Sequence, residues 1–391
     1  MYFVHPQIRL RDFLKAKFAL LKPSNEKKLK EKLGSYFPAK QFVFTDMARD
    51  AFKVIIEKMN LANTAMILPA YICDIFYPIL KHYNITPVFL DIDLKTFHIK
   101  IEEIKNKITP EVKSILVCHT YGLPIDVQAV KTAVGEGVVV IEDCAHAFFA
   151  QKNGIFAGNL GDVSFFSLYK QLPSLRGGML VCPGDFRIDL SKTAFNLRDL
   201  LSFLNYFWPF AFFFKKFGSD YAKTHLRESK STKPGGIIRA ALNLFSDFFG
   251  ESKGSLEKRK KLALMFQKEL KNLGFEAQES GENVFCYLSA LIPKSLTGKR
   301  DRIVQELRGH RVFCTRIWSE KYVIILNEDV PKEYQINLAD FPNTTEAAQR
   351  IINFPLQNHY TEKDVKKMVE SLKKVMSSLI ENQGSGEARF L

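Results

Sequence analysis

Between residues 41 and 182, short apolar runs alternate with segments of helical periodicity. The apolar runs are QFVFT, AMILPA, TPVFLDID, KSILVCH and VVVIED, and segments such as MARDAFKVIIEKMN and DVQAVKTAV separate them. Strands that alternate with helices at this spacing form βαβ units, whose strands run parallel. After Gly161 two strands follow with little between them, DVSFFSLYK and GGMLVC. The pattern predicts an α/β fold whose large domain, residues 41–182, holds a mostly parallel sheet.

The rest of the chain divides into four further segments. Residues 1–40 are expected to form an N-terminal arm with helices. Residues 183–254 are rich in Phe and basic residues and read as an insertion. Residues 255–380 begin with the amphipathic segment SLEKRKKLALMFQKELKNLGF, which ends at a glycine as helices often do, and predict a smaller C-terminal α/β domain. The tail ENQGSGEARFL, residues 381–391, is expected to be disordered.

Composition and charge narrow the functional classes. The six cysteines are scattered without metal-type spacing, so we expect no metal site and no disulfide framework, and reduced thiols favour the cytoplasm. The N-terminus lacks the basic-then-apolar pattern of a signal peptide. The net charge of +14 indicates a negatively charged partner, such as a phosphorylated substrate or an acidic membrane surface. Nucleic acid is disfavoured because the lysines are spread along the chain.

The stretch VVVIEDCAHAFFA brings ionisable side chains to the end of an apolar strand. Asp143 and His146 follow the strand directly, and Lys170 follows the otherwise apolar strand VSFFSL. Ligand sites of parallel sheets lie outside the carboxyl ends of the strands. Read alone, Asp143 is equally explained as a turn cap, His146 as a packed histidine and Lys170 as a solvated lysine.

Several motifs, in this order, resemble the DegT/DnrJ/StrS family of sugar aminotransferases. They are LPAYICDIFYPIL with TPVFLDIDLKTFHI, VCHTYGLPIDVQAV, VIEDCAHAFFA, GNLGDVSFFSLYKQLPSLRGGMLV and FPNTTEAAQRIINFPLQNHYTEKDV. The resemblance implies a fold-type-I transferase of the aspartate-aminotransferase kind, with pyridoxal phosphate (PLP) as cofactor. It also implies a homodimer with active sites at the subunit interface.

The resemblance gives roles to the strand-end residues. Asp143 would keep the pyridine nitrogen of PLP protonated, which the cofactor needs as an electron sink. Lys170 would bond covalently to the cofactor and act as the general base. His146 stands where the family usually has Gln, near the ring and its phenolic oxygen. The segment from Ser167 to Lys170 is shorter than in the usual family form, which implies a different local loop geometry.

Further cofactor contacts follow from the same alignment. The stretch TDMARDAF aligns with the family's phosphate-binding motif, in which Ala48 and Arg49 take the places of a Gly and a Thr. We expect their backbone N–H groups and the Arg49 guanidinium to bind the phosphate. Ser167 matches a phosphate-binding serine. Cys73 takes the place of an aromatic ring on the pyridine face, with Tyr71 as the alternative neighbour. His119 matches a family histidine, with a satisfied core histidine as the alternative.

The segment LLSFLNYFWPFAFFFKKF, residues 200–217, is too short for a spanning helix, and Pro209 argues for two short pieces with a bend. One interpretation is a lid or dimer contact. The other is a membrane-surface patch, in which the aromatic residues act with cations that follow them. Those cations are Lys215, Lys216, Lys223, Arg227, Lys230 and Lys233.

We expect a PLP-dependent aminotransferase that acts on a nucleotide-linked keto-sugar with an amino-acid donor, glutamate in most of the family. Such a reaction belongs to amino-sugar and surface-polysaccharide biosynthesis. The alternatives are another PLP reaction on the same fold, such as sugar dehydration or amino-acid chemistry, and a non-catalytic regulatory or scaffold member. The related dehydratases replace the lysine with His, so Lys170 favours amino transfer.

Overall fold

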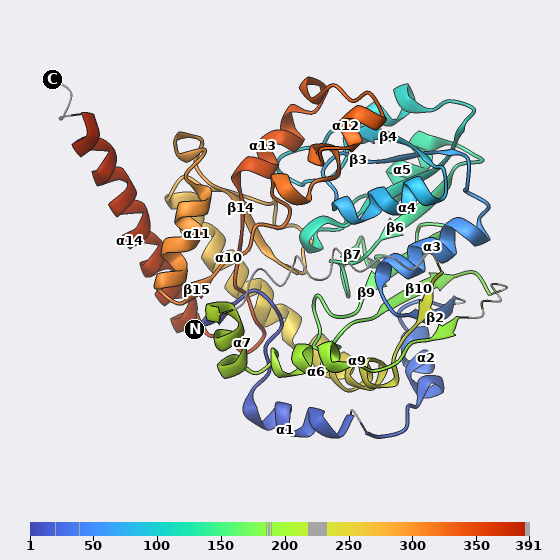
Figure 1. The fold of residues 1–391 in the computed structure, drawn as a ribbon, viewed down its shortest axis with the longest axis horizontal. Helices are drawn as coiled ribbons and strands as arrows, with labels where there is room; N and C mark the ends of the chain where they lie inside the picture. The colour runs from blue at the N-terminus through green and yellow to red at the C-terminus, as the bar shows by residue number, and fades with distance from the viewer. Residues whose placement is uncertain are drawn as a thin grey trace.

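A nine-stranded sheet forms the centre of the chain, in the order β11-β12-β2-β10-β9-β6-β5-β3-β4. The computed structural model describes residues 1–387 except 20, 39, 185, 187, 189 and 218–232 (Figure 1). The strands are β2 (Gln41–Thr45), β3 (Ala65–Pro69), β4 (Thr86–Leu90), β5 (Val112–Cys118), β6 (Val139–Asp143), β9 (Val163–Ser167), β10 (Gly178–Cys182), β11 (Ser191–Lys192) and β12 (Gly235–Gly236).

The strand directions confirm the predicted large, mostly parallel sheet. β4, β3, β5, β6 and β9 pair in parallel, and β10 runs antiparallel to both β9 and β2. In this register Cys118 of β5 is the partner of Asp143 of β6, and Asp143 is in turn the partner of Phe165 in β9. The carboxyl ends of three neighbouring strands therefore lie side by side.

The helices between these strands contribute buried residues to the core. α3 (Ala48–Lys58) has buried residues from Asp50 to Ile56 and contributes Phe52, Val54 and Ile55 to the largest core cluster. The predicted helix after β3 is a short 3-10 turn followed by one α-helix, and the predicted helix after β4 is entirely 3-10. The elements are η1 (Asp74–Phe76), α4 (Tyr77–His82), η2 (Ile101–Lys107), η3 (Thr120–Gly122) and α5 (Val127–Val134).

The N-terminal arm reaches across to the C-terminal part of the chain. It contains β1 (Tyr2–Phe3), α1 (Leu10–Ala19) and α2 (Glu26–Gly34), and β1 pairs in parallel with β15 (Val312–Phe313). Gln357 fastens it further, because its Nε2 atom lies 3.0, 2.8 and 3.0 Å from the carbonyl oxygens of Phe3, Val4 and His5.

The C-terminal part has its own core around a small three-stranded sheet. Its sheet and main helices are β13 (Glu276–Ala277), β14 (Leu288–Leu291), β16 (Ile351–Phe354), α10 (Leu256–Asn272), α11 (Arg300–Gly309) and α14 (Glu362–Glu387). Its shorter elements are η4 (Lys253–Ser255), η5 (Lys294–Leu296), η6 (Glu320–Tyr322), η7 (Ile324–Leu326), α12 (Val330–Glu333), η8 (Leu338–Asp340) and α13 (Pro342–Arg350). A separate hairpin, β7 (Gln151–Lys152) and β8 (Ile155–Phe156), lies in the large domain. Residues 323–351 add Val323, Ile324, Ala347 and Ile351 to the core of the large sheet, so this stretch does not belong to the small core alone.

Residues 183–254 are more than an insertion on the surface. They contain α6 (Leu197–Leu204), α7 (Trp208–Phe217) and α9 (Arg239–Ser252), and β11 and β12 extend the large sheet, with Gly236 opposite Thr45. The two helices α6 and α7 match the two short pieces predicted around Pro209. The predicted cations Lys223, Arg227 and Lys230 lie outside the described residues. No helix within the described ranges has the length and apolar character needed to cross a membrane.

The predicted disordered tail differs from the structure. α14 continues through Glu387, beyond the predicted boundary at 381, and residues 388–391 lie outside the described part. Leu372, Met376 and Leu379 anchor this helix in the C-terminal core. Because extending an existing helix needs no new nucleation, polar residues can continue it.

Candidate active site

Asp143 is the last residue of β6, and it is buried, with only 8% of its surface exposed. Its Oδ1 accepts a hydrogen bond of 2.9 Å from the backbone N–H of Ala145, and its Oδ2 lies 3.9 Å from Cys118 Sγ. Burial raises the pKa of Asp143, and the charge of Lys170 acts in the opposite direction. A positively charged group near Oδ2 would lower the pKa of this carboxyl group and keep it ionised.

Lys170 and His146, both predicted from the sequence, are in direct contact. Lys170 Nζ lies 2.9 Å from His146 Nε2, and the backbone N–H of Tyr121 donates to His146 Nδ1 over 3.3 Å. Burial lowers the pKa of His146 well below its ordinary value, so the ring is neutral. Because Nδ1 accepts, the neutral ring carries its hydrogen on Nε2, which faces the Lys170 amine; this hydrogen is donated to the amine only when the amine is neutral, since a charged ammonium has no lone pair to accept it. A lone pair on this amine is what covalent attachment to a carbonyl carbon requires.

Three aromatic side chains enclose His146. The ring centroids of Tyr121, Trp318 and Tyr287 lie 5.9, 5.3 and 5.1 Å from that of His146, with Tyr121 stacked on it. Trp318 and Tyr287 come from beyond residue 255, so the C-terminal part closes over the ends of β5 and β6. Our sequence reasoning missed all three, and only Tyr121 lies in a quoted motif, CHTYG.

Ser167 and the N-terminus of α3 meet in one row of the sheet. Ser167 pairs with Gly178, and Gly178 pairs with Thr45, just before α3. A side chain at Gly178 would place its Cβ 2.5 Å from the Met47 carbonyl carbon, so only glycine permits this close approach. Ser167 Oγ is buried and has no hydrogen-bond partner among the described residues. A hydroxyl and a helix N-terminus together form the donors that a phosphate needs.

Ala48 and Arg49 occupy the first turn of α3. Ala48 has helical backbone geometry, so its replacement of the family glycine causes no strain at this position. Arg49 lies close enough to Asp46 and Asp50 to oppose electrostatically the effect of burial, which raises the pKa of Asp46 to about 6 and that of Asp50 above its ordinary value. The ion-pair partners of these acids are Arg176, 3.1 Å from Asp46, and Lys53, 3.3 Å from Asp50, and Arg49 has a smaller effect on both.

Cys73 and Tyr71, the two expected neighbours of the pyridine face, both pack in the core near the aromatic enclosure, Tyr71 buried and Cys73 partly buried. Burial raises the pKa of the Cys73 thiol to about 12, and the charge of Lys170 acts on this thiol as well. The Tyr71 hydroxyl lies 2.8 Å from that of Tyr121 and donates to the carbonyl of Trp318 over 3.0 Å. Tyr71 therefore supports the aromatic enclosure from behind.

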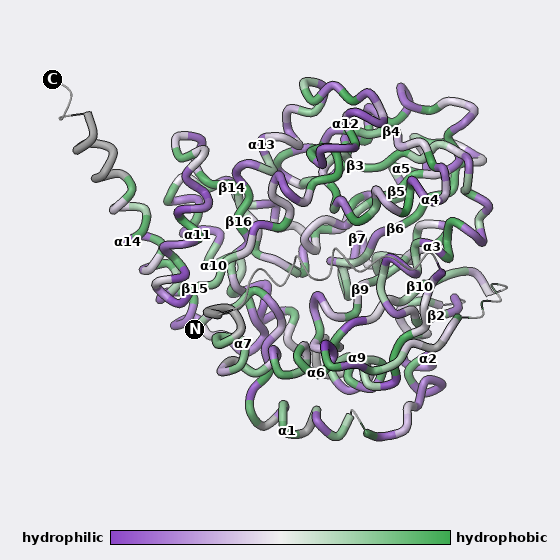
Figure 2. The backbone as a smooth tube through the Cα atoms, in the orientation of Figure 1, coloured by the Kyte–Doolittle hydropathy of each residue, from purple (hydrophilic) through white to green (hydrophobic). Residues whose placement is uncertain are grey.

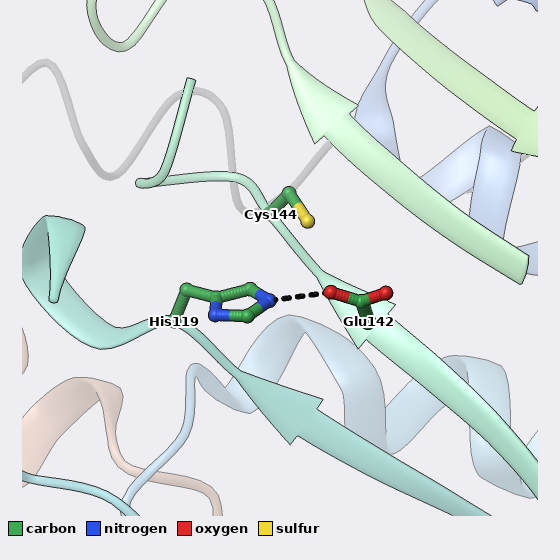
Figure 3. A group of neighbouring side chains, drawn as sticks. All are labelled: His119, Glu142 and Cys144. Atoms are coloured by element: carbon green, nitrogen blue, oxygen red, sulfur yellow. Dashed lines mark hydrogen bonds and ion pairs between the residues drawn. The ribbon is translucent and has the colours of Figure 1, made fainter. Parts of the chain in front are cut away.

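His119 belongs to a hydrogen-bonded cluster in the core. Its Nε2 donates to Glu142 Oε2 over 2.9 Å, and its Nδ1 accepts from the backbone N–H of Ile125 over 3.2 Å (Figure 3). Both ring nitrogens are thus satisfied within the protein, which supports the alternative of a core histidine and leaves only the ring face for a cofactor contact.

The same cluster has the composition of a metal site. His119, Glu142 and Cys144 each place a potential ligand atom within 4.8 Å of the others. Glu142 also accepts from the backbone N–H groups of Gly158 and Gly161. Burial raises the pKa of the Cys144 thiol well above its ordinary value, whereas metals bind the thiolate. Hydrogen bonding accounts for the arrangement.

The residues present fit PLP. The buried Asp143 carboxylate, the Lys170 amine with a neutral imidazole donor, and the unpartnered Ser167 hydroxyl offer a separate partner for the ring nitrogen, the reactive carbon and the phosphate. The geometry brings Lys170 and His146 together beside Asp143, and joins Ser167 with the strand end that precedes α3. Each individual role remains a prediction.

Comparison with known proteins gives the same family. The sequence model of the DegT/DnrJ/EryC1/StrS aminotransferase family matches residues 7–198 and 249–373. The GDP-perosamine synthase of Escherichia coli O157:H7 is 39% identical over 105 residues, which span 26% of this chain and 29% of that relative.

Solved structures share the fold at low sequence identity. PseC of Helicobacter pylori, an aminotransferase in pseudoaminic acid biosynthesis, superposes with a TM-score of 0.75 at 14% identity and covers 96% of this chain and 99% of its own. The GDP-4-keto-6-deoxy-D-mannose-3-dehydratase of E. coli, with bound hydrated PLP, gives 0.74 at 17% identity, over 95% and 99% of the two chains. The chain belongs to the DegT/DnrJ/EryC1/StrS aminotransferase family, a family of PLP-dependent enzymes with the predicted fold.

Proposed function

We propose that this chain transfers an amino group from an amino-acid donor, glutamate, to a nucleotide-linked keto-sugar in the biosynthesis of amino sugars for surface polysaccharides. The observation that carries the proposal is the contact between Lys170 Nζ and His146 Nε2, beside the buried Asp143. Relatives named as nucleotide-sugar aminotransferases or synthases, such as the GDP-perosamine synthase, support the substrate class.

Each site residue has one task in this reaction. PLP, when bound, supplies the electron sink for the bonds of the amino-bearing carbon. Asp143 holds the proton on the ring nitrogen, and the Ser167 hydroxyl and the first turn of α3 hold the phosphate. Lys170 takes the proton from Cα of the donor, for which it must hold a free electron pair. His146 keeps this amine oriented by donating to it, and Tyr121 and Trp318 exclude water.

Two rivals predict different products. A dehydratase of the same fold would remove a hydroxyl from the sugar, and a regulatory member would convert nothing. Lys170 supports amino transfer because the related dehydratases have His at the corresponding position. The purified protein should be incubated with PLP, glutamate and a panel of nucleotide-linked keto-sugars, with products identified by mass spectrometry. An amino sugar formed together with 2-oxoglutarate supports the proposal, whereas a deoxygenated sugar or no product contradicts it.

We further propose a cytoplasmic homodimer that contacts the inner face of a membrane. All exposed large apolar side chains that the structure describes, except Ile155, Leu264 and Leu338, lie in residues 10–21 and 195–213. The set is Leu10, Leu14, Phe18, Leu21, Phe195, Leu197, Leu200, Leu201, Phe210 and Phe213. We call it the apolar edge. Phe13 of α1 stacks on Phe203 and Phe207 at 4.7 and 5.2 Å, so the two parts adjoin (Figures 1 and 2).

Charge supports lipid as the occupant of the apolar edge. The sequence from 9 to 22 contains five cations and one acid, namely Arg9, Arg11, Lys15, Lys17 and Lys22 against Asp12. An apolar face flanked by cations binds anionic lipid surfaces. Two copies of the chain meeting through this edge would instead bring like charges together.

A further inference from the structure

A cavity of about 320 Å³ lies beside the candidate active site, where three parts of the chain meet. The N-terminal arm, the turn after β9 and the C-terminal part each line it, and Gln171, the residue after Lys170, is in its wall. None of the functions assigned above uses this cavity.

Three residues that line this cavity each have a buried polar atom without a hydrogen-bond partner. Gln7 Oε1, Arg259 Nε and Asn358 Oδ1 have no hydrogen-bond partner in the part of the chain that the structure describes. An unsatisfied buried polar atom costs free energy, and native proteins rarely leave several together. Their convergence indicates a bound ligand with both donor and acceptor atoms.

The buried guanidinium of Arg259 indicates that this ligand is an anion. The residue is only 6% exposed, and its Nη2 donates to the Leu356 carbonyl over 3.2 Å. Among the described residues no carboxylate forms an ion pair with it, and burial lowers the pKa of its guanidinium. A buried cation without an anion is expensive, and a bound anion would repay this cost.

Other charges at the cavity have the same sign. Arg9 and Lys258 are exposed at its walls, and Asp12 is the only acidic residue lining it among the described residues. Burial lowers the pKa of His359 to about 4, so this histidine adds a neutral hydrogen-bonding group at pH 7. Three cations facing one carboxylate suit a ligand that carries about two negative charges.

The cavity is linked to the reacting groups through Tyr287. Arg259 and Lys170 both lie near enough to Cys286 to affect the pKa of its thiol, and Arg259 also affects the pKa of Tyr287. The Tyr287 ring in turn contacts that of His146 at 5.1 Å. The cavity therefore adjoins the reacting groups, since Gln171 in its wall directly follows Lys170.

We propose that this cavity binds the diphosphate group of the nucleotide-linked substrate, with Arg259 as its buried anchor and Arg9 and Lys258 at its mouth. The proposal rests on the proposed function, since that function supplies a substrate with a diphosphate. Arg is suited to this task because its planar fork binds two phosphate oxygens at once. The carboxylate of the amino-acid donor shares the oxyanion chemistry but carries a single charge.

Pyrophosphate binding by calorimetry tests the assignment without requiring turnover. Saturating PLP is added first, so that the cofactor's own phosphate site is filled. Arg9→Ala and Lys258→Ala should each weaken pyrophosphate binding about tenfold, near the lower end of the range for hydrogen bonds to charged groups. Lys268→Ala removes a charge from an exposed site on the same helix, α10, and should bind as the wild type does.

Arg259→Met separates a ligand-binding role from a structural one. Without an anionic partner in the fold, replacement of this buried cation by an apolar side chain should leave the melting temperature unchanged or higher while abolishing pyrophosphate binding. A lower melting temperature with unchanged binding would assign Arg259 to the fold and overturn the proposal. The proposal would also be overturned if the protein bound glutamate tightly but not pyrophosphate, and if Arg9→Ala and Lys258→Ala weakened this glutamate binding. If the expected pyrophosphate results are obtained but the wild-type protein transfers no amino group, the proposed function fails while the assignment of the cavity as an anion site stands.

Discussion

Lys170 Nζ lies 2.9 Å from His146 Nε2, while the other nitrogen of the same ring accepts the backbone N–H of Tyr121. This pair of contacts fixes the tautomer of a buried neutral imidazole and directs its one hydrogen at the lysine amine. A glutamine, the usual family residue at 146, would donate through an amide that does not titrate near neutral pH. Burial of a neutral His146 therefore makes the stability of the fold, which such a glutamine would not affect in this way, depend on pH.

The first prediction is that His146→Gln flattens the pH dependence of stability. A histidine in the unfolded chain titrates near 6.5, whereas burial holds the pKa of folded His146 well below that. Below about pH 6.5 the unfolded state binds a proton that the folded state does not, so the free energy of unfolding falls as pH falls. The loss is at most about 1.4 kcal/mol per pH unit for one group.

Urea unfolding of the cofactor-free protein at pH 5, 6, 7 and 8 measures this slope. Buried His98 and His359, whose pKa values are lowered to about 3 and 4, should maintain part of the slope in the variant. Identical slopes in wild type and His146→Gln would show that folding does not lower the pKa of His146, and would contradict its burial as a neutral ring.

The second prediction concerns Asp143. Asp143→Asn removes the charge that holds the ring proton but preserves shape and the phosphate contacts. PLP binding should remain close to wild type, while kcat falls about 10²-fold or more, the scale for loss of one preorganised electrostatic group. Cofactor titration and steady-state rates measure the two quantities separately. Near-normal kcat would remove Asp143 from this role.

The third prediction concerns the phosphate. Ser167→Ala and Arg49→Ala should each weaken PLP binding by about 1.5–3 kcal/mol, the range for hydrogen bonds to a charged group. Ser167 Oγ is buried without a partner among the described residues, so its removal leaves no other unpaired group. Equilibrium titration of the cofactor checks both variants. If Arg49→Ala binds PLP normally, the helix N-terminus holds the phosphate and Arg49 serves Asp46 and Asp50.

Local patterns predicted the sheet and the residues at its strand ends. An apolar run followed directly by an ionisable residue such as Asp143 or Lys170 can be recognised from a few neighbouring positions. They did not predict Tyr121, Tyr287 and Trp318 around His146, since these contacts depend on how the C-terminal part packs on the large sheet. The pairing of β1 with β15 joins residues 310 positions apart in the sequence, and no local signal marks it.

The fourth prediction is that the apolar edge binds anionic lipid. The protein should sediment with vesicles containing anionic lipid but not with neutral vesicles, and the bound fraction should fall as salt rises. A variant with Phe18→Ser, Leu21→Ser and Leu197→Ser should lose binding, because the three side chains are 64, 79 and 70% exposed.

A matched control exists elsewhere on the surface. Leu264→Ser with Leu338→Ser removes exposed leucines outside the apolar edge and should leave vesicle binding unchanged. If the wild type ignores anionic vesicles and the Phe18, Leu21 and Leu197 variant changes oligomeric state, the edge is a contact between subunits.

Borohydride reduction of the PLP-loaded protein, followed by peptide mapping in a mass spectrometer, tests the central claim most directly. Reduction fixes the covalent bond between a lysine and the cofactor, and the account predicts a single adduct on the peptide that carries Lys170. Lys170→Ala should lose the adduct while the protein remains folded, and Lys152→Ala should retain it. An adduct on another lysine, or none in the wild type, would contradict the account.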